Sequence, residues 1–254
     1  MNKNNDFKYT FLMCINKTNP FIGLAIESVL QQTDQDFEFY IIANNCDDAL
    51  WNHLLTFDDP RIRLHRTLIG QLAFNLNYGA NLIKEGYILR MDADDISLPD
   101  RLAVTKKRLH ENNYPDVMGG AALLIDEHGK EIGKTSPILG NERIRHALWK
   151  KNTFVHPTCA IRLDALFKAR GYLGGFMSED YDLWVRMARD KAVVFCNTDD
   201  VLIQYRIHSG QARGNRMGYA ESAGMMIREF FLKRKSLYFF GFIIAIAKIL
   251  LKSK

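Results

Sequence analysis

The chain has 254 residues, of which 47% are hydrophobic and 25% charged, as expected for a globular protein with one substantial core. The net charge is +5, but residues 228–254 hold seven Lys and Arg against one Glu, which leaves the remainder near −1. A nucleic-acid-binding domain would carry its positive charge on the folded body, so this distribution argues against nucleic acid as a partner. It predicts instead a basic tail with a partner of its own.

The cysteines and the N-terminus favour a cytoplasmic protein. Cys14, Cys46, Cys159 and Cys196 are far apart and form no Cys-x-x-Cys pair, so neither a zinc site nor a disulfide framework is indicated. The first six residues are polar and lack the apolar core of a signal peptide, so we expect no export.

Strands and helices alternate through about the first 110 residues. Apolar runs predict strands at 9–15, 37–42 and 87–91 and a short one at 61–65. Helices are predicted after Asn19-Pro20, which fit the N-cap and first helical positions, at 71–83, and from Pro99. This alternation predicts an α/β fold with a Rossmann-like, mostly parallel central sheet and flanking helices.

After residue 113 the pattern changes. A strand at 117–125 is followed by a turn at 126–129 and a return strand at 131–133. Residues 141–149 have a helical pattern, and 153–161 are expected to be extended, because the residue before Pro157 avoids the helical region. A helix with an inward apolar stripe is predicted after Ser178, which is a plausible N-cap.

Three carboxylates follow the strand at 87–91 within four positions: Asp92, Asp94 and Asp95. Carboxylates so close together repel one another unless a cation or hydrogen-bond donors offset their charge, and open α/β sheets bind ligands at the C-terminal ends of their strands. Oxygen-rich sites of this kind suit Mg²⁺ or Mn²⁺, which in turn hold phosphates. The alternative is an acidic loop that caps the helix starting at Pro99.

Six stretches in a fixed order carry a resemblance to a known family. They are the first strand with Asn19-Pro20, Phe37-Glu38, Asp92-Ala93-Asp94-Asp95 with Pro99-Asp100-Arg101, His156-Pro157-Thr158, Glu179-Asp180-Tyr181-Asp182-Leu183-Trp184, and Tyr205-Arg206-Ile207-His208. In this order and spacing they resemble the family 2 glycosyltransferases and their GT-A fold, over roughly residues 9 to 210. The resemblance implies a domain at 1–218, with a nucleotide-binding half at about 1–112 and an acceptor half at about 113–218.

The resemblance also implies a donor site with a divalent cation, Mn²⁺ or Mg²⁺. Asp94 is then the main metal ligand, Asp92 contacts the metal or the ribose, and His208 completes the metal shell or reaches the diphosphate. Asp95 orients the loop or the sugar, and Arg206 pairs with phosphate. The remaining residues assigned to the donor are Asn16, Asn44, Asn77 and Arg90.

Glu179 and Asp180 resemble the acidic pair of this family, in which the aspartate is the general base on the acceptor hydroxyl. The implied reaction is a single in-line displacement at the anomeric carbon, with inversion. Alternatively, these acids only favour the positive end of their helix. His156 and Trp184 are assigned to the acceptor side, although His156 alternatively just ends a strand.

Two departures from the family pattern concern the nucleotide. Relatives often have Asp-Asp where this chain has Ala43-Asn44, and the second of those aspartates normally reads the base. An Asn oxygen accepts from uracil N3–H, but its amide equally serves an acceptor, so a UDP-sugar is favoured and other bases stay open. The segment 70–79 is also one residue longer than usual before Asn77, which leaves its base and ribose contacts open.

Residues 219–254 form a basic and apolar tail. Residues 237–251 are apolar except for Lys248, and as a helix they span roughly 22 Å, less than the roughly 30 Å of a bilayer core. We therefore expect an amphipathic helix lying on an anionic membrane, with a core-docked or dimer-forming helix as the alternative. Peripheral attachment to the inner face of the cell membrane suits a polyprenyl-linked glycan acceptor.

The hypothesis is an inverting, metal-dependent glycosyltransferase of cell-surface polysaccharide synthesis that uses a nucleotide-sugar donor and a glycan or lipid-linked glycan acceptor. One alternative is a haloacid-dehalogenase-like phosphatase, with Asp92 and Asp94 as nucleophile and acid and Asp199-Asp200 as its metal pair. The other is a catalytically silent, membrane-associated scaffold, for which Ala43-Asn44 is the only indication.

Overall fold

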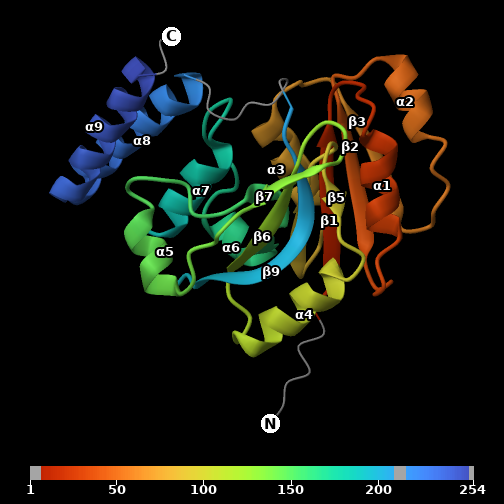
Figure 1. Cartoon of the computed structure of the whole chain (residues 1–254), viewed down its shortest axis with the longest axis horizontal. Helices are drawn as coiled ribbons and strands as arrows, with labels where there is room; N and C mark the ends of the chain where they lie inside the picture. Colours follow the sequence, from red (N-terminus) through yellow and green to blue (C-terminus); the bar gives the residue numbers. More distant parts are fainter. Residues whose placement is uncertain (1–6, 209–215, 252–254) are drawn as a thin grey trace.

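The computed structural model describes residues 7–208 and 216–251, which form an α/β fold around one curled sheet (Figure 1). The strands are β1 (Tyr9–Ile15), β2 (Glu38–Asn44), β3 (Ile62–Thr67), β4 (Tyr87–Met91), β5 (Ile96–Ser97), β6 (Val117–Ile125), β7 (Glu131–Lys134), β8 (Ala160–Arg162) and β9 (Phe195–Arg206). The helices are α1 (Ile22–Leu30), α2 (Asp48–Leu54), α3 (Leu72–Leu82), α4 (Arg101–Glu111), α5 (Asn141–Ala147), α6 (Leu163–Lys168), α7 (Glu179–Met187), α8 (Arg216–Lys233) and α9 (Ser236–Leu251).

The sheet has the order β3-β2-β1-β4-β8-β6-β9-β5, with β7 paired to β6. The half β3-β2-β1-β4 is parallel, as the alternation of strands and helices predicts. Beyond β4 the sheet is mixed, because β8 runs antiparallel to both β4 and β6 while β6 and β9 are parallel. The α/β class is thus confirmed, with the parallel strands concentrated in the first half.

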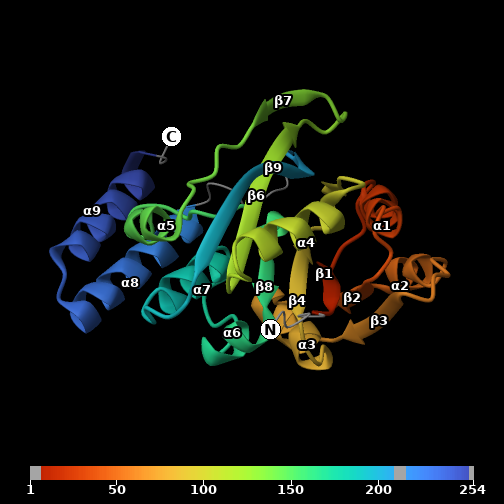
Figure 2. The ribbon, with the colours of Figure 1, turned by 90° about the horizontal axis from the view of Figure 1, so that it is seen from below.

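Two apolar layers cover the two faces of the sheet, because successive side chains of a strand point to opposite sides. Phe11 and Met13 of β1 pack in the layer with α1, α2 and α4. Leu12, between them, packs in the other layer, with α3, α5, α6 and α7. Figure 2 shows α1 and α4 on one side of the sheet and α3 and α6 on the other. This packing fixes the carboxyl ends of the parallel strands β1, β2 and β4 side by side, at one end of the strands.

Several predicted boundaries differ from the structure. The Oδ1 of Asn19 accepts from the backbone N–H of Phe21 at 2.8 Å, and α1 begins only at Ile22. Similarly, α4 begins at Arg101 rather than at Pro99. The segment 153–161 is not extended throughout: residues His156–Thr158 form a 3₁₀ turn before the short strand β8.

The C-terminal helices form a hairpin that packs on the rest of the fold. Asp182 of α7 accepts from Arg186 on its own helix at 2.5 Å and from Arg228 of α8 at 2.8 Å. Arg189, just after α7, forms an ion pair with Glu229 of α8, which is fully buried. Since α8 begins at Arg216, the predicted boundary between residues 218 and 219 falls inside a helix. Residues 7–208 and 216–251 include no helix long and apolar enough to span a bilayer.

Candidate active site

A cavity of about 800 Å³ opens beside the carboxyl ends of β1 and β4. Acids from distant parts of the sequence line it together: Asp92 and Asp94 follow β4, whereas Glu179 and Asp180 begin α7. The cavity is also lined by four other residues that the sequence assigned to the site, namely Asn16, Arg90, His156 and His208.

Arg90 is the buried cation next to these acids. Only 1% of its surface is exposed, and its guanidinium donates hydrogen bonds to the Asp92 carboxylate and to the carbonyl of Met91. Burial raises the pKa of Asp92, while the charge of Arg90 opposes this shift. Asp92 is therefore held in place by Arg90, and one of its oxygens is already engaged.

Asp94 and His208 face each other, with the Nε2 of His208 2.9 Å from the Oδ2 of Asp94. A carboxylate and an imidazole suit Mn²⁺, and both side chains line the cavity. The described residues, 7–208 and 216–251, contain no group of three or more His, Cys, Asp and Glu placed to hold a metal ion. Mg²⁺ and Mn²⁺ commonly take one or two protein ligands and complete their shell with substrate phosphates and water, so this pair fits such a cation.

Arg206 and Asp95 support the acidic loop from behind instead of lining the cavity. The guanidinium of Arg206 donates to the carbonyls of Asp94 at 3.0 Å and Asp126 at 3.1 Å, and it stacks on Phe21 with 4.0 Å to the ring centroid. Its backbone N–H donates to Asp95 at 2.9 Å. The side chain of Arg206 thus holds the loop that carries Asp94, and its expected pairing with phosphate stays a prediction.

Three other expected contacts also lie outside the cavity wall. Asn44, at the end of β2, is only 3% exposed, and its expected contact with a base stays a prediction. Asn77 bonds both the N–H and the carbonyl of Tyr172 at 2.8 Å and so braces that loop. Trp184 is fully buried against Phe154, and its place on the acceptor side is corrected to one in the core.

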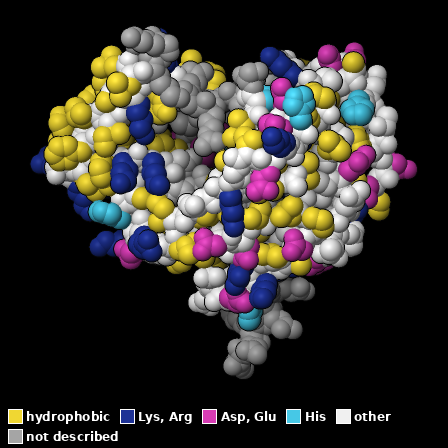
Figure 3. Space-filling model, in the orientation of Figure 1, with side chains coloured by type: hydrophobic (Ala, Val, Ile, Leu, Met, Phe, Trp, Pro, Cys, Tyr) yellow, Lys and Arg dark blue, Asp and Glu magenta, His cyan; other side chains and the backbone are white. Residues whose placement is uncertain are grey.

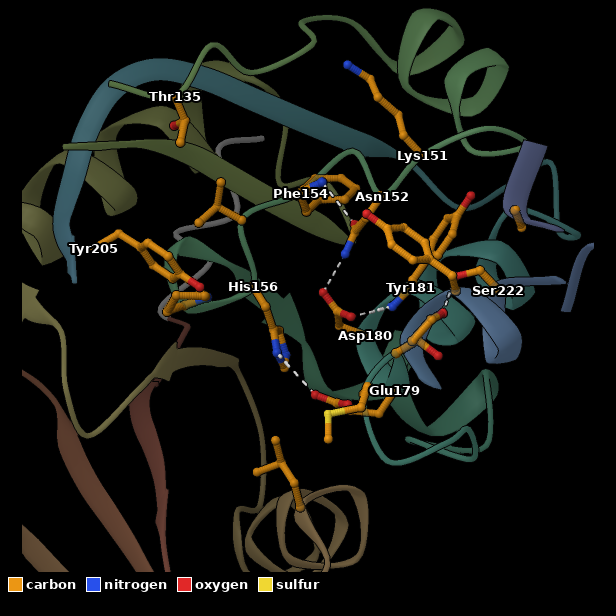
Figure 4. A pocket seen from close by; sticks show the side chains of 18 of the residues that line it. Thr135, Lys151, Asn152, Phe154, His156, Glu179, Asp180, Tyr181, Tyr205 and Ser222 are labelled. Atoms are coloured by element: carbon orange, nitrogen blue, oxygen red, sulfur yellow. Dashed lines mark hydrogen bonds and ion pairs between the residues drawn. The ribbon is translucent and has the colours of Figure 1, made fainter. Parts of the chain in front are cut away.

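Asp180 is oriented by two hydrogen bonds (Figure 4). The Nδ2 of Asn152 donates to its Oδ2 at 2.6 Å, and the Tyr181 N–H donates to its Oδ1 at 2.7 Å. Burial raises the pKa of Asp180, whereas these two hydrogen bonds favour its ionised form. Burial and the neighbouring charge of Asp180 raise the pKa of Glu179 from 4.5 to about 8. At neutral pH, Glu179 is therefore largely protonated.

His156 lies between Glu179 and Tyr172. Its Nδ1 is 4.0 Å from the Oε1 of Glu179, and its Nε2 is 3.0 Å from the Tyr172 hydroxyl (Figure 4). Burial, reinforced by the charge of Arg90, lowers the pKa of His156 well below its usual value. His156 is thus a neutral imidazole in the wall of the cavity.

The start of α7 is held by α8. Glu221 of α8 accepts from the Ser178 hydroxyl at 2.6 Å and from the backbone N–H groups of Phe176 at 2.6 Å and Met177 at 3.1 Å. Ser178 occupies the N-cap position, but its side chain makes no capping hydrogen bond, so that part of the prediction is wrong. The loop before Asp180 is fixed by a carboxylate that lies 43 to 45 residues further along the chain than the groups it binds.

Sequence reasoning missed Asn152, Tyr172 and Glu221. None of them belongs to a motif, and each acts through a contact that exists only after folding, such as the bond from Asn152 to Asp180. The positions of Asn152 and Glu221 beside α7 give no local signal in the sequence.

Comparison with known proteins identifies the family of the chain. The chain matches the family model for glycosyl transferase family 2 over residues 10–171. It is 35% identical to the O-antigen biosynthesis glycosyltransferase WbnJ of Escherichia coli, over 95% of this chain and 96% of that protein. It is 23% identical to the UDP-Glc:α-D-GlcNAc-diphosphoundecaprenol β-1,3-glucosyltransferase WfgD of Escherichia coli, over 83% of this chain and 81% of that protein.

Solved structures share the fold at low sequence identity. Residues 1–349 of S. aureus TarS in complex with UDP-GlcNAc superimpose with a TM-score of 0.67 and 13% identity, over 88% of this chain and 67% of that one. The mannosyltransferase PcManGT of Pyrobaculum calidifontis, in complex with GDP-Man and Mn²⁺, gives 0.66 and 13%, over 96% and 74%.

The fold is that of the GT-A glycosyltransferases, and an acid-lined cavity opens at the carboxyl edge of its sheet. The chain belongs to glycosyl transferase family 2. The phosphatase alternative is wrong: besides the family match, Asp200 is paired with Arg108 of α4 at 2.6 Å, and neither Asp199 nor Asp200 lines the cavity.

The raised pKa of Glu179 predicts a pH-dependent stability. Between pH 4.5 and about 8, the folded protein keeps a proton on Glu179 that the unfolded chain has released, so folding stability falls as pH rises through this window. Glu179→Gln removes this dependence. Relative to wild type, its free energy of unfolding in urea with EDTA should increase by roughly 2–4 kcal/mol from pH 4.5 to 8.5.

Glu85→Gln, at an exposed position, is the matched control and should follow the wild-type pH profile. A constant difference between Glu179→Gln and wild type across this pH range would show that Glu179 ionises normally in the folded protein.

Proposed function

We propose that the protein is an inverting glycosyltransferase that moves a sugar from a nucleotide-diphosphate donor to a hydroxyl of a glycan or lipid-linked glycan. The observation that carries this proposal is the shared cavity, in which Asp92 and Asp94 lie on one side and Glu179 and Asp180 on another. One set of acids is placed for a cation and its diphosphate, and the other for an acceptor hydroxyl.

Asp180 is the proposed general base. As the acceptor oxygen bonds to the anomeric carbon, its proton passes to the Asp180 carboxylate, and the bond from that carbon to the diphosphate oxygen breaks on the opposite face. The nucleoside diphosphate leaves with the electron pair, and the configuration inverts. Asn152 keeps Asp180 in position, and the raised pKa of Glu179, about 8, leaves Asp180 as the carboxylate that takes the proton.

Asp94 and His208 are the residues that would hold Mn²⁺ or Mg²⁺, and when bound, the cation would neutralise charge on the leaving diphosphate. PcManGT, which shares the fold, has been solved with Mn²⁺ and GDP-Man, and this supports the proposal of a divalent cation. We favour a UDP-sugar as donor, in line with the UDP-GlcNAc complex of TarS and the UDP-Glc named for WfgD.

The acceptor belongs, we propose, to cell-surface polysaccharide synthesis. WbnJ is named for O-antigen biosynthesis, and WfgD for transfer to α-D-GlcNAc-diphosphoundecaprenol. An acceptor carried on a membrane lipid would place the enzyme at the cytoplasmic face of the membrane. A helical hairpin with exposed apolar residues could attach it there.

Substitution of the two acids separates donor binding from transfer. Nucleotide sugars are screened for Mn²⁺-dependent donor hydrolysis and transfer, and UDP with Mn²⁺ is tested for thermal stabilisation. Asp180→Asn should keep the stabilisation and lower transfer by about 10²–10⁴-fold, because only the proton acceptor is lost. Asp94→Ala should lose both.

Asp190→Asn, at an exposed position after α7, is the control and should behave as wild type. Unimpaired transfer by Asp180→Asn would remove it as the base. If the wild-type protein neither hydrolyses nor binds any nucleotide sugar, the scaffold alternative is correct.

We further propose that the α8–α9 hairpin lies on an anionic membrane surface. Phe240 and Ile243 of α9 are 58% and 47% exposed, and Phe231, Leu250 and Leu251 are more exposed still. Figure 3 shows these helices' side of the molecule covered by hydrophobic side chains, with Lys and Arg side chains next to them. Apolar and basic side chains side by side favour the interface of a bilayer that contains anionic lipid.

Replacing two apolar residues of this surface with aspartate should release the protein from membranes. Phe240→Asp/Ile243→Asp is expected to weaken co-sedimentation with phosphatidylglycerol-containing vesicles by roughly tenfold or more, because burial of both side chains is lost. Leu55→Asp/Leu68→Asp, at exposed positions in the first half of the chain, is the control. Equal binding of both variants and wild type would exclude α9 as the contact surface.

A further inference from the structure

The part of the cavity beyond Asp180 has walls of a different character. The loop after α5 contributes Trp149 to Asn152, and the C-terminal hairpin contributes the residues Tyr219, Ser222, Met226, Gly241, Ile244, Ala245 and Lys248. The hairpin is therefore a wall of the cavity as well as a surface feature. The proposed base, donor diphosphate and cation do not explain why the cavity has these additional walls.

Helix α9 is seated directly on the loop. A Cβ at Gly241 would lie 2.2 Å from the carbonyl oxygen of Trp149 and 3.1 Å from the Met226 side chain, so only glycine permits this approach. The contact places Ile244, Ala245 and Lys248, which follow on the same helix, along the cavity. The apolar wall and the loop are thus parts of one packed unit.

The charges in this half of the cavity are all positive. They belong to Lys150, Lys151 and Lys248, and none of these ammonium groups has an Asp or Glu of the described chain within 4.0 Å. Lys150 lies 5.9 Å from the centroid of the Trp149 ring, and Lys248 lies 5.6 Å from that of Tyr219. Figure 4 shows Lys151 beyond Asn152, with its ammonium turned away from Asp180.

This segregation of charge suits a second anion. The acids and the proposed cation account for the donor diphosphate, whereas Lys151 lies beyond Asn152 (Figure 4), and Lys150 and Lys248 also line the cavity. Lysines bind phosphates as point charges, and near Lys248 the cavity is lined by Ile244 and Ala245 of α9, the helix that also exposes Phe240 and Ile243. An anion joined to an apolar chain matches both features.

We infer that Lys150, Lys151 and Lys248 form a second phosphate site that binds the diphosphate linking the acceptor sugar to a polyprenyl chain, and that this chain leaves the cavity along α9. The inference rests on the proposed function, because it places the acceptor hydroxyl at Asp180 and the diphosphate at least one sugar away from it. It assigns the acceptor specificity of the enzyme to the loop after α5 and to the C-terminal hairpin.

Farnesyl diphosphate is the probe that tests this site without an acceptor sugar. Calorimetry is done on the full chain saturated with UDP and Mn²⁺, so that the donor site is filled, and without vesicles. We expect saturable binding that weakens about tenfold or more in Lys150→Ala/Lys151→Ala. Lys84→Ala/Lys107→Ala, which removes two exposed lysines outside the cavity, should bind as wild type. Thermal melting verifies that both variants fold.

Comparison ligands decide what the site recognises. Farnesol and inorganic pyrophosphate should each bind at least about tenfold more weakly than farnesyl diphosphate, because each supplies only one of the two features. If pyrophosphate binds as tightly as farnesyl diphosphate, the apolar wall does not contribute to binding. Equally tight binding of soluble dihexanoyl phosphatidylglycerol would show a general lipid headgroup site.

Three further outcomes would overturn the inference. They are the absence of binding to the wild-type protein, binding only when UDP is omitted, and unchanged binding by Lys150→Ala/Lys151→Ala. Donor hydrolysis by the wild-type enzyme tests the proposed function separately. If hydrolysis is observed but farnesyl diphosphate does not bind, the second phosphate site is wrong and the proposed function still stands.

Discussion

The site depends on one electrostatic constraint, which is the packing of several carboxylates around the buried guanidinium of Arg90. Arg90 is inside the protein, bonded to Asp92, and its charge also acts on Glu179 and His156. Buried acids of like charge are costly unless some are protonated or paired. Here Asp92 is paired with Arg90 and Glu179 holds its proton to about pH 8, which is consistent with the proposed roles of Asp94 and Asp180.

The C-terminal hairpin is tied to the catalytic helix by several independent contacts. Glu221 holds the loop before α7, and Arg228 pairs with Asp182 inside the helix. A single helix, α7, therefore carries the proposed base on one side and the anchor of the hairpin on the other. Because the same hairpin exposes apolar side chains and lines the cavity, the proposed membrane surface and the proposed acceptor site belong to one structural unit.

The sequence predicts those features that are local. The apolar runs of β1, β2 and β4 and the acids that follow β4 are visible because a buried strand and its terminal loop are adjacent in the chain. The long strand β9 was not predicted, since polar residues at 197–200 interrupt its apolar pattern. Motif resemblance placed Arg206 and Trp184 near the site but carries no information on side-chain direction, and both turned out to face protein groups. The contacts of Asn152 and Glu221 join segments 28 and 43 residues apart, so no local pattern reveals them.

The central claim is that acids from distant parts of the chain serve one substrate complex. The measurement that tests it most directly is a crystal structure with UDP and Mn²⁺, in which anomalous scattering locates the metal. We predict one Mn²⁺ peak in contact with Asp94 and His208, bound to the diphosphate of UDP, within the same cavity as Asp180. A peak that lies elsewhere, or a diphosphate separated from Asp180 by packed protein, would contradict the proposed arrangement.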